Sequence, residues 1–423
     1  MLLIYTEQLS PRFSFIIKQI FQRMLGLEIK ITTDLECFIK SDSYKLSYAK
    51  SAIGNEFFVK NFGLLYEKGF RKIDIFIEYL EDNIPYFFSA KKGSFPFDIF
   101  SASFFLLSRY EEYRCHTTEK YEDFPATKSL AYKYHFLEIP IVDIWVQKFK
   151  KALQEKYPDL LFSPNEYTEI SIIEIAKAFR YKHKGIVRSV SRAMVDIFTF
   201  NIRNFVTRLK VISGKINDPF DIYEQLVDFH KENNTRSIFF FLLANYSIHD
   251  KGISYNSMKY KYLIKQMGDY SIVSVLSSFF AVFNMDEMKN EQKRMNAILN
   301  RNISRFRANN NILPLPDIYR KLTECEYKED YTMGYTTHIG FRSGTCTPYF
   351  FYDIGLEVEL PVLVHSFCIH SQVIEKQKDK LIIKKINTLK QHIKNVKGYF
   401  IPVFSNEYIA NDNFNFYKQI INL

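Results

Sequence analysis

Only a few side chains in the sequence combine the residue types and positions that acid–base chemistry needs. Glu174 and Glu407 lie at the ends of two apolar segments, 169–175 and 399–404, which we expect to be strands. Chemistry in parallel α/β folds sits at the carboxyl ends of the strands, so either carboxylate could act as an acid or a base. Neither has a histidine beside it in sequence. The sequence therefore offers isolated carboxylates at these positions.

Two further groups contain potential ligands or nucleophiles. If the run from His365 to His370 is a strand, His365 faces away from Cys368 and His370, which leaves two ligands on one face. A zinc site takes at least three ligands from the protein, so we interpret this run as a packed strand end. Cys115 and His116 are adjacent, and neighbours in sequence rarely face one another. We expect them to lie in a surface loop.

The segment Gly340–Pro348, GFRSGTCTP, is rich in glycine and hydroxyl groups, as is a loop that cradles an anion. It does not match a phosphate-binding loop. Arg342 and Thr345 could bind a ligand together with Asp330, which we expect at a strand end facing the same pocket. A buried ion pair between Arg342 and Asp330 that fixes the loop explains the same residues equally well.

These residues depend for their positions on an alternation of strand and helix patterns after residue 168. The predicted strands are 169–175, 237–243 and 272–276, with others near 303, 331–333, 361–365 and 399–404. The predicted helices are 192–212, 218–233, 259–267 and 285–299. Such alternation predicts an α/β fold with a parallel sheet, either open or closed as a barrel.

Residues 1–160 follow a different pattern. A short strand, LLIY, precedes a predicted helix over 11–25, and longer helices are predicted over 97–109 and 141–157. Proline, serine and asparagine in LLFSPNEY, residues 160–167, indicate a boundary. We therefore predict two domains, a smaller α+β domain over 1–160 and an α/β domain over 168–423.

The charge of the chain does not favour a nucleic-acid partner. The 57 lysines and arginines exceed the 47 acidic residues by ten, but most are scattered and no nucleic-acid-reading motif is present. The densest run, 375–397, has apolar residues at helical spacing, so its lysines form the solvated face of one helix. The excess basic charge favours, weakly, a polyanionic partner such as an acidic glycan or a lipid surface.

Three features that the sequence lacks indicate the cellular compartment. The five cysteines are widely spaced without a CxxC pair, as in proteins of a reducing compartment. The first residues lack a signal-peptide pattern, and no apolar run is long enough to span a bilayer. We therefore expect a cytoplasmic protein without a transmembrane segment.

Several long segments resemble bacterial polysaccharide-deacetylase-like proteins. The most specific is EDYTMGYTTHIGFRSGTCTPYFFYD, residues 329–353. LIYTEQLSPRFSFI (3–16), FDIFSASFFLLSRYEEY (97–113) and SLAYKYHFLEIPIVDIW (129–145) resemble an extra N-terminal domain of such proteins. The resemblance spans almost the whole chain. It implies a distorted β/α barrel of the NodB-homology type, and many proteins of this kind are encoded in surface-polysaccharide gene clusters.

The resemblance also shows which family residues are replaced. The catalytic base falls at Glu174, but the metal-binding aspartate falls at Ala176, which has no ligand atom. The two metal- or proton-handling histidines fall at Leu276 and Ser405. The arginine of a further motif matches Arg305.

In that same motif, the histidine position beside Arg305 is occupied by Arg307. We interpret the chain as a polysaccharide-deacetylase-like protein without metal-dependent hydrolase activity and without a cofactor. It would act in or beside surface or capsular polysaccharide metabolism, with a glycan or a polysaccharide-synthesis enzyme as its partner. Two alternatives stay open: an active carbohydrate hydrolase with a rearranged site that uses Glu174, or a scaffold module for a partner enzyme.

Overall fold

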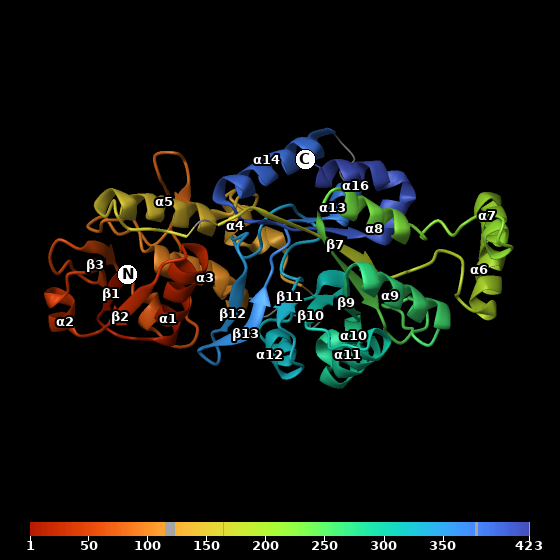
Figure 1. Cartoon of the computed structure of the whole chain (residues 1–423), viewed down its shortest axis with the longest axis horizontal. Coiled ribbons are helices and arrows are strands. Elements are labelled where there is room, and N and C mark those ends of the chain that lie inside the picture. Colours follow the sequence, from red (N-terminus) through yellow and green to blue (C-terminus); the bar gives the residue numbers. More distant parts are fainter. Residues whose placement is uncertain (115–122, 164, 377–379, 423) are drawn as a thin grey trace.

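The computed structural model describes residues 1–114, 123–163, 165–376 and 380–422, so the Cys115–His116 pair lies outside it. The described residues form a four-stranded sheet and a small antiparallel pair, β5 (Glu78–Tyr79) and β6 (Pro85–Tyr86), in the N-terminal part, and a ten-stranded sheet in the second part. The two parts lie side by side along the longest axis of the molecule (Figure 1). The second part carries most of the helices.

The N-terminal sheet has the strand order β2-β1-β3-β4, and all of its strands are parallel. The strands are β1 (Leu2–Thr6), β2 (Ile29–Thr32), β3 (Tyr44–Ala49) and β4 (Phe57–Lys60). The main helices are α1 (Pro11–Ile17), continued by a π-helical turn (Lys18–Met24), α2 (Leu35–Lys40), α3 (Ile99–Leu107) and α5 (Ile141–Lys156). The expected α+β arrangement is corrected here, because α1 and α2 connect parallel strands, as in an α/β layer.

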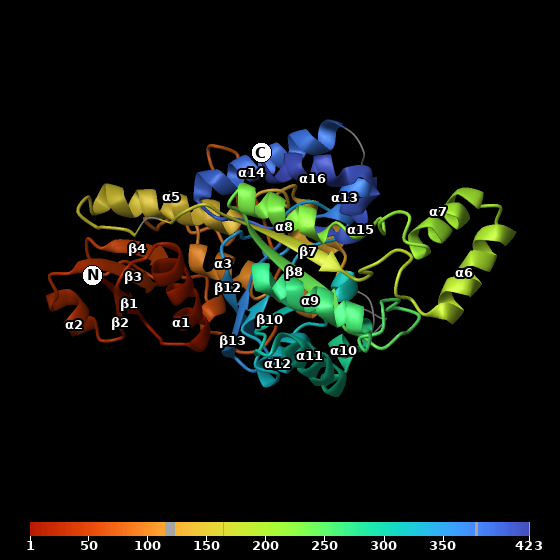
Figure 2. The ribbon, with the colours of Figure 1, turned by 45° about the vertical axis from the view of Figure 1, so that its right-hand side comes forward.

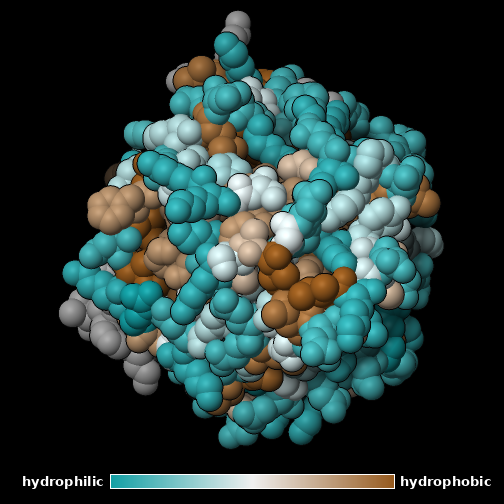
Figure 3. All heavy atoms as spheres, turned by 90° about the vertical axis from the view of Figure 1, so that its left-hand side faces the viewer, coloured by the Kyte–Doolittle hydropathy of each residue, from teal (hydrophilic) through white to brown (hydrophobic). Residues whose placement is uncertain are grey.

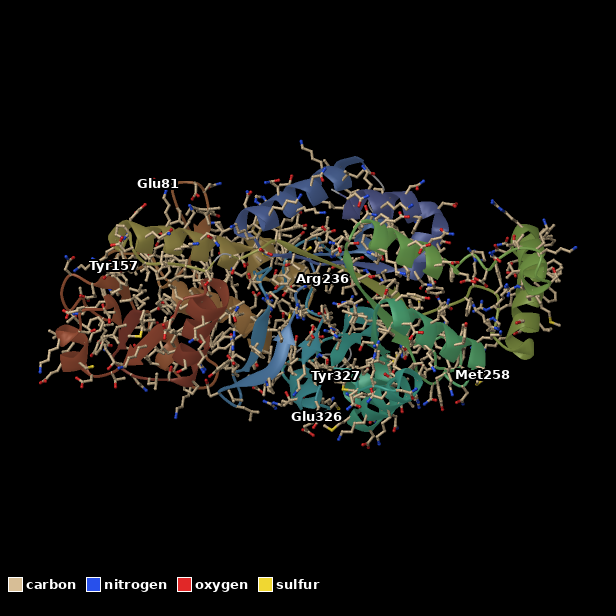
Figure 4. The ribbon with its side chains drawn as sticks, in the orientation of Figure 1. Glu81, Tyr157, Arg236, Met258, Glu326 and Tyr327 are labelled. Carbon is tan, nitrogen blue, oxygen red and sulfur yellow. The ribbon has the colours of Figure 1, made fainter. Side chains whose placement is uncertain are left out.

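Local sequence signals explain where these helices begin. Ser10 caps α1 by accepting a hydrogen bond from the Phe13 amide at 3.0 Å, and Pro11 occupies the first helical position. The predicted helices 11–25, 97–109 and 141–157 are confirmed. Tyr157, labelled in Figure 4, follows α5 and donates a hydrogen bond to the Lys45 carbonyl of β3 at 2.7 Å. This contact holds α5 against the four-stranded sheet.

The second sheet is mostly parallel, with the order β12-β13-β11-β10-β9-β8-β7-β16-β14, and β15 pairs with β7 beside this path. Its strands are β7 (Thr168–Ile175), β8 (Arg236–Leu242), β9 (Ile272–Ser277), β10 (Arg305–Ala308), β11 (Glu329–Asp330), β12 (Tyr349–Asp353), β13 (Val358–Val364), β14 (Ile369–His370), β15 (Tyr399–Phe400) and β16 (Pro402–Ser405). Only β12 pairs antiparallel, with β13. The prediction of an α/β fold with a parallel sheet is confirmed.

Helices surround this sheet in both ribbon views (Figures 1 and 2). They are α8 (Tyr223–Glu232), α9 (Met258–Tyr270), α10 (Phe279–Phe283), α11 (Met285–Leu299), α12 (Asp317–Glu324), α13 (Ser371–Lys376), α14 (Lys380–Val396), α15 (Asn406–Tyr408) and α16 (Phe414–Ile421). Arg236 and Met258, both labelled in Figure 4, begin β8 and α9. The large core lies between these helices and one face of the sheet, and a second, smaller core lies on the other face.

Alternation along the strands separates the two faces. Ile173 and Ile175 of β7 belong to the large core shared with the helices, whereas Ile170 and Ile172 belong to a second, smaller core. The smaller core, called the inner cluster below, consists of Ile170, Ile172, Ile238, Phe240, Leu242, Ala244, Leu276, Tyr331, Phe367, Ile401 and Val403. Glu174 lies on the same face of β7 as Ile172, since side chains two residues apart share a face.

Two sequence predictions in this part need correction. The helix predicted over 192–212 is two helices, α6 (Ile186–Phe198) and α7 (Ile202–Ile212), and Asn201 caps the second. The helix predicted over 218–233 begins later, since α8 starts at Tyr223. The Asp218 carboxylate accepts hydrogen bonds from the amides of residues 180–182, just after β7.

Within the described residues, every helix is too short or too polar to traverse a lipid bilayer. The four described cysteines, Cys37, Cys325, Cys346 and Cys368, are unpaired thiols.

Candidate functional site

The most highly charged contact on the inner face joins Glu174 to an arginine and a histidine from distant strands. Glu174 accepts a hydrogen bond from Arg307 of β10, with Oε1 and Nε 2.6 Å apart. Its other oxygen lies 3.2 Å from Nε2 of His370, which ends β14. The Glu174 side chain is 12% exposed, and those of Arg307 and His370 are 0% and 4% exposed. Three segments of the sheet therefore meet in one buried ion pair.

The Arg307 guanidinium has further partners on the inner face. Its Nη1 donates a hydrogen bond to the carbonyl of Tyr331, and its carbon lies 4.8 Å from the ring centre of Phe367. Its Nη2 is buried and has no hydrogen-bond partner among the described residues. Arg307 thus supplies a fixed positive charge, and one of its donors is unused.

These contacts decide the protonation state of Glu174. Burial alone would raise the pKa of the carboxyl group, but the charge of Arg307 and the contact with His370 outweigh burial and lower the pKa to about 2. A general base works best when its pKa is near the working pH. Glu174 is therefore a stable anion bound to Arg307 and a weak candidate for the base of a hydrolase.

The low pKa of Glu174 predicts how the protein responds to acid. A carboxyl group whose folded pKa lies below its ordinary value of 4.5 stabilises the fold fully above pH 4.5, and this stabilisation is lost as the pH falls towards 2. We expect the difference in unfolding free energy between the native protein and Glu174→Gln to be constant from neutral pH to about pH 5. It should then shrink by about 3 kcal/mol in stronger acid. Denaturant unfolding at several pH values measures this difference, and a change centred near pH 6–7 would show that Glu174 titrates as a base should.

The positions that hold the metal or handle a proton in the resembled family are occupied by groups with other roles. Leu276 is fully buried in the inner cluster, and Ala176 packs against the same cluster. Ser405 pairs in register with Glu174, and its hydroxyl caps α15 by accepting from the Tyr408 amide at 3.1 Å. In the part of the chain that the structure describes, no group of three His, Cys, Asp or Glu side chains could hold a metal ion. These residues do not fit a divalent cation.

The segment from His365 to His370 differs from its prediction. It is not one strand, because β13 ends at Val364 and β14 begins at Ile369, so alternation does not decide the direction of its side chains. His365 stacks on Tyr331 with ring centres 4.5 Å apart, and burial lowers the pKa of its imidazole to about 4. The sulfur of Cys368 faces the Ile401 carbonyl at 3.6 Å. The two histidines therefore have separate partners.

Arg305, which the resemblance marked as a site residue, is not brought to Glu174. It precedes Arg307 by two residues on β10 and pairs with Glu329 of β11 at 2.9 Å, with 31% of its side chain exposed. The residue that does reach Glu174 is Arg307. The sequence could have indicated Arg307, because it follows Arg305 by two residues on the same strand and side chains two residues apart share a face.

The three residues expected to form a binding rim each have hydrogen-bond partners of their own. The Asp330 carboxylate accepts hydrogen bonds from Tyr319 of α12 at 2.9 Å and from the Thr332 hydroxyl at 2.6 Å, so it points to the helix layer. The Thr345 hydroxyl accepts from the Thr347 amide at 3.1 Å within its own turn. Burial raises the pKa of Asp330 to about 6.

Arg342 joins the two parts of the chain. It donates two hydrogen bonds to Glu112, at 2.9 and 2.8 Å, and one to Asp123 at 2.8 Å, and its side chain is 0% exposed. Arg109 of the N-terminal part pairs with Glu111 and Glu112. The Arg342 loop thus anchors the second part of the chain to the N-terminal part. Arg342 forms its ion pairs with Glu112 and Asp123, and not with Asp330.

A second site lies at the carboxyl end of β7. The loop after β7 and helices α6 and α7 border a cavity of about 460 Å³. Seven of its lining side chains are basic and two are acidic: Lys177, Arg180, Lys184, Arg188, Arg192, Arg208 and Lys251, with Asp196 and Glu407. We call this cavity the basic cleft.

Ion pairs neutralise only part of the basic cleft. Lys177 pairs with Glu407 at 2.8 Å, and Arg208 pairs with Asp196 at 2.7 Å. Burial, followed by repulsion from Lys177, lowers the pKa of Lys184 to about 8. The excess of positive charge suits an anionic ligand. Six of the seven cations come from residues 177–208 and the seventh is Lys251, and the sequence analysis did not single out this segment.

One family model and one solved structure resemble parts of the chain. A model for a family of unknown function, DUF7033, matches residues 2–158, which is less than half of the chain. No curated protein matches the chain. Among solved structures, one from Mycobacterium smegmatis described as a "putative polysaccharide deacetylase" has a TM-score of 0.38 and 9% identity, over 62% of this chain and 85% of that one. A likeness this low assigns neither a fold family nor a function.

Proposed function

We propose that the protein binds an anionic carbohydrate in the basic cleft and does not hydrolyse it by a metal-dependent mechanism. The observation that carries this proposal is the excess of cationic side chains at the carboxyl end of β7. Guanidinium groups bind carboxylate, sulfate and phosphate oxygens through paired hydrogen bonds. A carbohydrate as the ligand rests on the sequence resemblance to polysaccharide-deacetylase-like proteins, and so does a role beside surface or capsular polysaccharide synthesis.

The same proposal includes a barrel-like second domain over residues 168–423, after a first domain over residues 1–160. β13 and β14 lie near opposite ends of the strand order, and only residues 365–368 separate them in sequence. A short link of this kind supports a sheet that curves towards closure. The inner cluster, with Glu174 and Arg307 beside it, would then fill the inside of the barrel.

The ion-paired carboxylate of Glu174 supports the proposal that the protein does not hydrolyse its ligand. A hydrolase of the resembled type polarises a carbonyl group with a cation and removes a proton from water. Here Arg307 holds the carboxylate, and an apolar side chain, Leu276, occupies a ligand position. Neither half of that chemistry has a suitable group. The hydrolase alternative therefore has less support than binding.

Titration calorimetry with a short oligogalacturonate tests the proposal. We expect binding that weakens as salt screens the charges, and none with a neutral cello-oligosaccharide of the same length. The double variant Arg180→Gln/Lys251→Ala removes two cations of the cleft and should weaken binding by about tenfold or more. Lys293→Ala, on the exposed surface of α11, is the matched control and should bind as the native protein does. Equal binding by the cleft variant and the native protein would contradict the assignment of the cleft.

A further inference from the structure

Helices α6 and α7 form a hairpin that stands away from the rest of the molecule. Both ribbon views show it projecting beyond the end of the second part, on the side towards which β7 points (Figures 1 and 2). The two helices pack against each other and are joined by residues 199–201. We call residues 186–212 the hairpin and residues 198–202 its tip.

Large apolar side chains of the hairpin face the solvent. At the tip, Phe198, Phe200 and Ile202 are 80%, 86% and 67% exposed. Other exposed apolar residues follow helical spacing: Val190, Met194 and Ile197 on α6, and Val206, Leu209 and Ile212 on α7. A folded protein rarely exposes so many contiguous apolar residues unless they contact something.

The opposite end of the molecule is different. Figure 3 shows that face, where hydrophilic residues predominate and apolar residues form small separate patches. Single exposed apolar residues of that kind need no explanation. The hairpin therefore differs from the face that Figure 3 shows.

Charge gathers on the same segment. Residues 177–216 contain ten lysines and arginines and one acidic residue, a net charge of +9 within a chain whose net charge is +10. Arg203 and Lys210 are exposed on α7, and Arg192 is exposed on α6. The one acidic residue, Asp196, is paired with Arg208. The exposed part of the hairpin is thus both apolar and uniformly basic.

We propose that the hairpin docks on an anionic phospholipid surface, with Phe198, Phe200 and Ile202 entering the headgroup region. Amphipathic helices with aromatic residues and lysines or arginines bind such interfaces, because apolar burial and attraction to anionic lipids act together. Neither the apolar residues nor the charge alone distinguishes a lipid surface from a protein, but a basic hairpin with an apolar tip complements a surface that is itself uniformly negative. A second copy of the chain would bring two basic hairpins together.

Docking in this way sets the position of the basic cleft. The hairpin follows β7 directly, and Arg188, Arg192 and Arg208 of the hairpin line the cleft. A docked hairpin would hold the cleft close to the lipid surface. The inference goes beyond the proposed function and does not depend on it, since tip residues and cleft residues are different.

Vesicle co-sedimentation tests the docking with the full chain. We expect the native protein to sediment with vesicles in which about a third of the phosphatidylcholine is replaced by phosphatidylglycerol, and to stay in solution with phosphatidylcholine alone. Phe198→Ser/Phe200→Ser and Arg203→Glu/Lys210→Glu should each reduce partitioning by about tenfold or more. High salt should reduce it as well.

Matched controls separate docking from general surface effects. Phe76→Ser removes a phenylalanine that is 80% exposed in the N-terminal part, and Lys293→Glu reverses an exposed charge on α11. Both should partition as the native protein does. Melting temperatures and oligogalacturonate binding should be unchanged in the tip variant, which keeps this test separate from that of the cleft.

Two results would overturn the docking proposal. One is equal sedimentation of the native protein and the two hairpin variants. The other is self-association in analytical ultracentrifugation that the tip variant abolishes, with no binding to anionic vesicles by the native protein. That second result would assign the apolar tip to contact between copies.

Discussion

Replacement of Arg342 by alanine should lower the free energy of unfolding by about 3–5 kcal/mol, as expected when one partner of a buried ion pair is removed. Its guanidinium has 0% exposure and contacts both Glu112 and Asp123. Without it, Asp123 loses its ion pair, and Glu112 keeps only Arg109. Arg342 also lies between the two parts of the chain, so the loss affects their junction.

The charges around Arg342 support a large loss of unfolding free energy. Burial alone would raise the pKa of Glu112, but the charges of Arg342 and then Arg109 outweigh it and lower the pKa. The carboxylate is therefore charged in the fold and depends on its cations. Denaturant unfolding of Arg342→Ala measures the effect. Arg71→Ala, which breaks an exposed pair with Glu67, is the control and should cost about 1 kcal/mol or less.

The outcome also decides between the two interpretations of the Arg342 loop. A large loss of stability with unchanged oligogalacturonate binding supports the anchor. If Arg342→Ala abolishes binding and lowers the free energy of unfolding by less than about 1 kcal/mol, Arg342 binds the ligand and does not serve as an anchor.

Replacement of Arg307, which breaks its ion pair with Glu174, should lower the free energy of unfolding about as much as replacement of Arg342. Arg307→Met leaves a carboxylate on the inner face beside apolar residues, and we expect a loss of about 3–5 kcal/mol. The double variant Glu174→Gln/Arg307→Met removes both charges and should recover most of that loss, because the remaining groups are neutral. Unfolding of the two single variants and the double variant forms a complete cycle.

The coupling energy from this cycle is the quantity to compare. We expect at least about 2 kcal/mol of favourable coupling between Glu174 and Arg307. Additive effects of the two substitutions would show that the pair does not determine the state of Glu174. The account of an ion-paired, inactive carboxylate would then be wrong.

The fold was predictable from the sequence where pattern and burial agree. The near-continuous apolar runs at 169–175, 237–243 and 272–276 are central strands of the second sheet, and such runs are typical of strands covered on both faces. The break between α6 and α7 was not predicted, because the apolar pattern continues through Phe198, Phe200 and Ile202. There the apolar residues mark an exposed tip and not a buried helix face.

The site was predictable only in part. The position of Glu174 at a strand end follows from the pattern of β7, but its partners come from β10 and β14, which the sequence separates by 133 and 196 residues. Asp330 was predicted at a strand end, yet its side chain points to α12, since Glu329 and Tyr331 take the inner face. A strand's register, and not its location, decides which side chain enters a site.

The basic cleft and the hairpin were missed for a related reason. The density of lysines is highest in the run 375–397, but acidic residues there offset part of the charge. Residues 177–216 carry a net charge of +9 over forty residues, against +6 over the 23 residues 375–397, so their charge is less dense although almost no acid offsets it. A count of net charge over a window as long as the segment itself would have found it.

The central claim is that the second part binds an anionic carbohydrate without a metal ion. Its most direct test is calorimetric titration of the native protein with oligogalacturonate, once in excess chelator and once after addition of zinc. We predict the same affinity in both titrations, since the cations of the cleft are lysines and arginines. Binding that occurs only with zinc, lost in Glu174→Gln, would contradict the claim and restore a metal-dependent site.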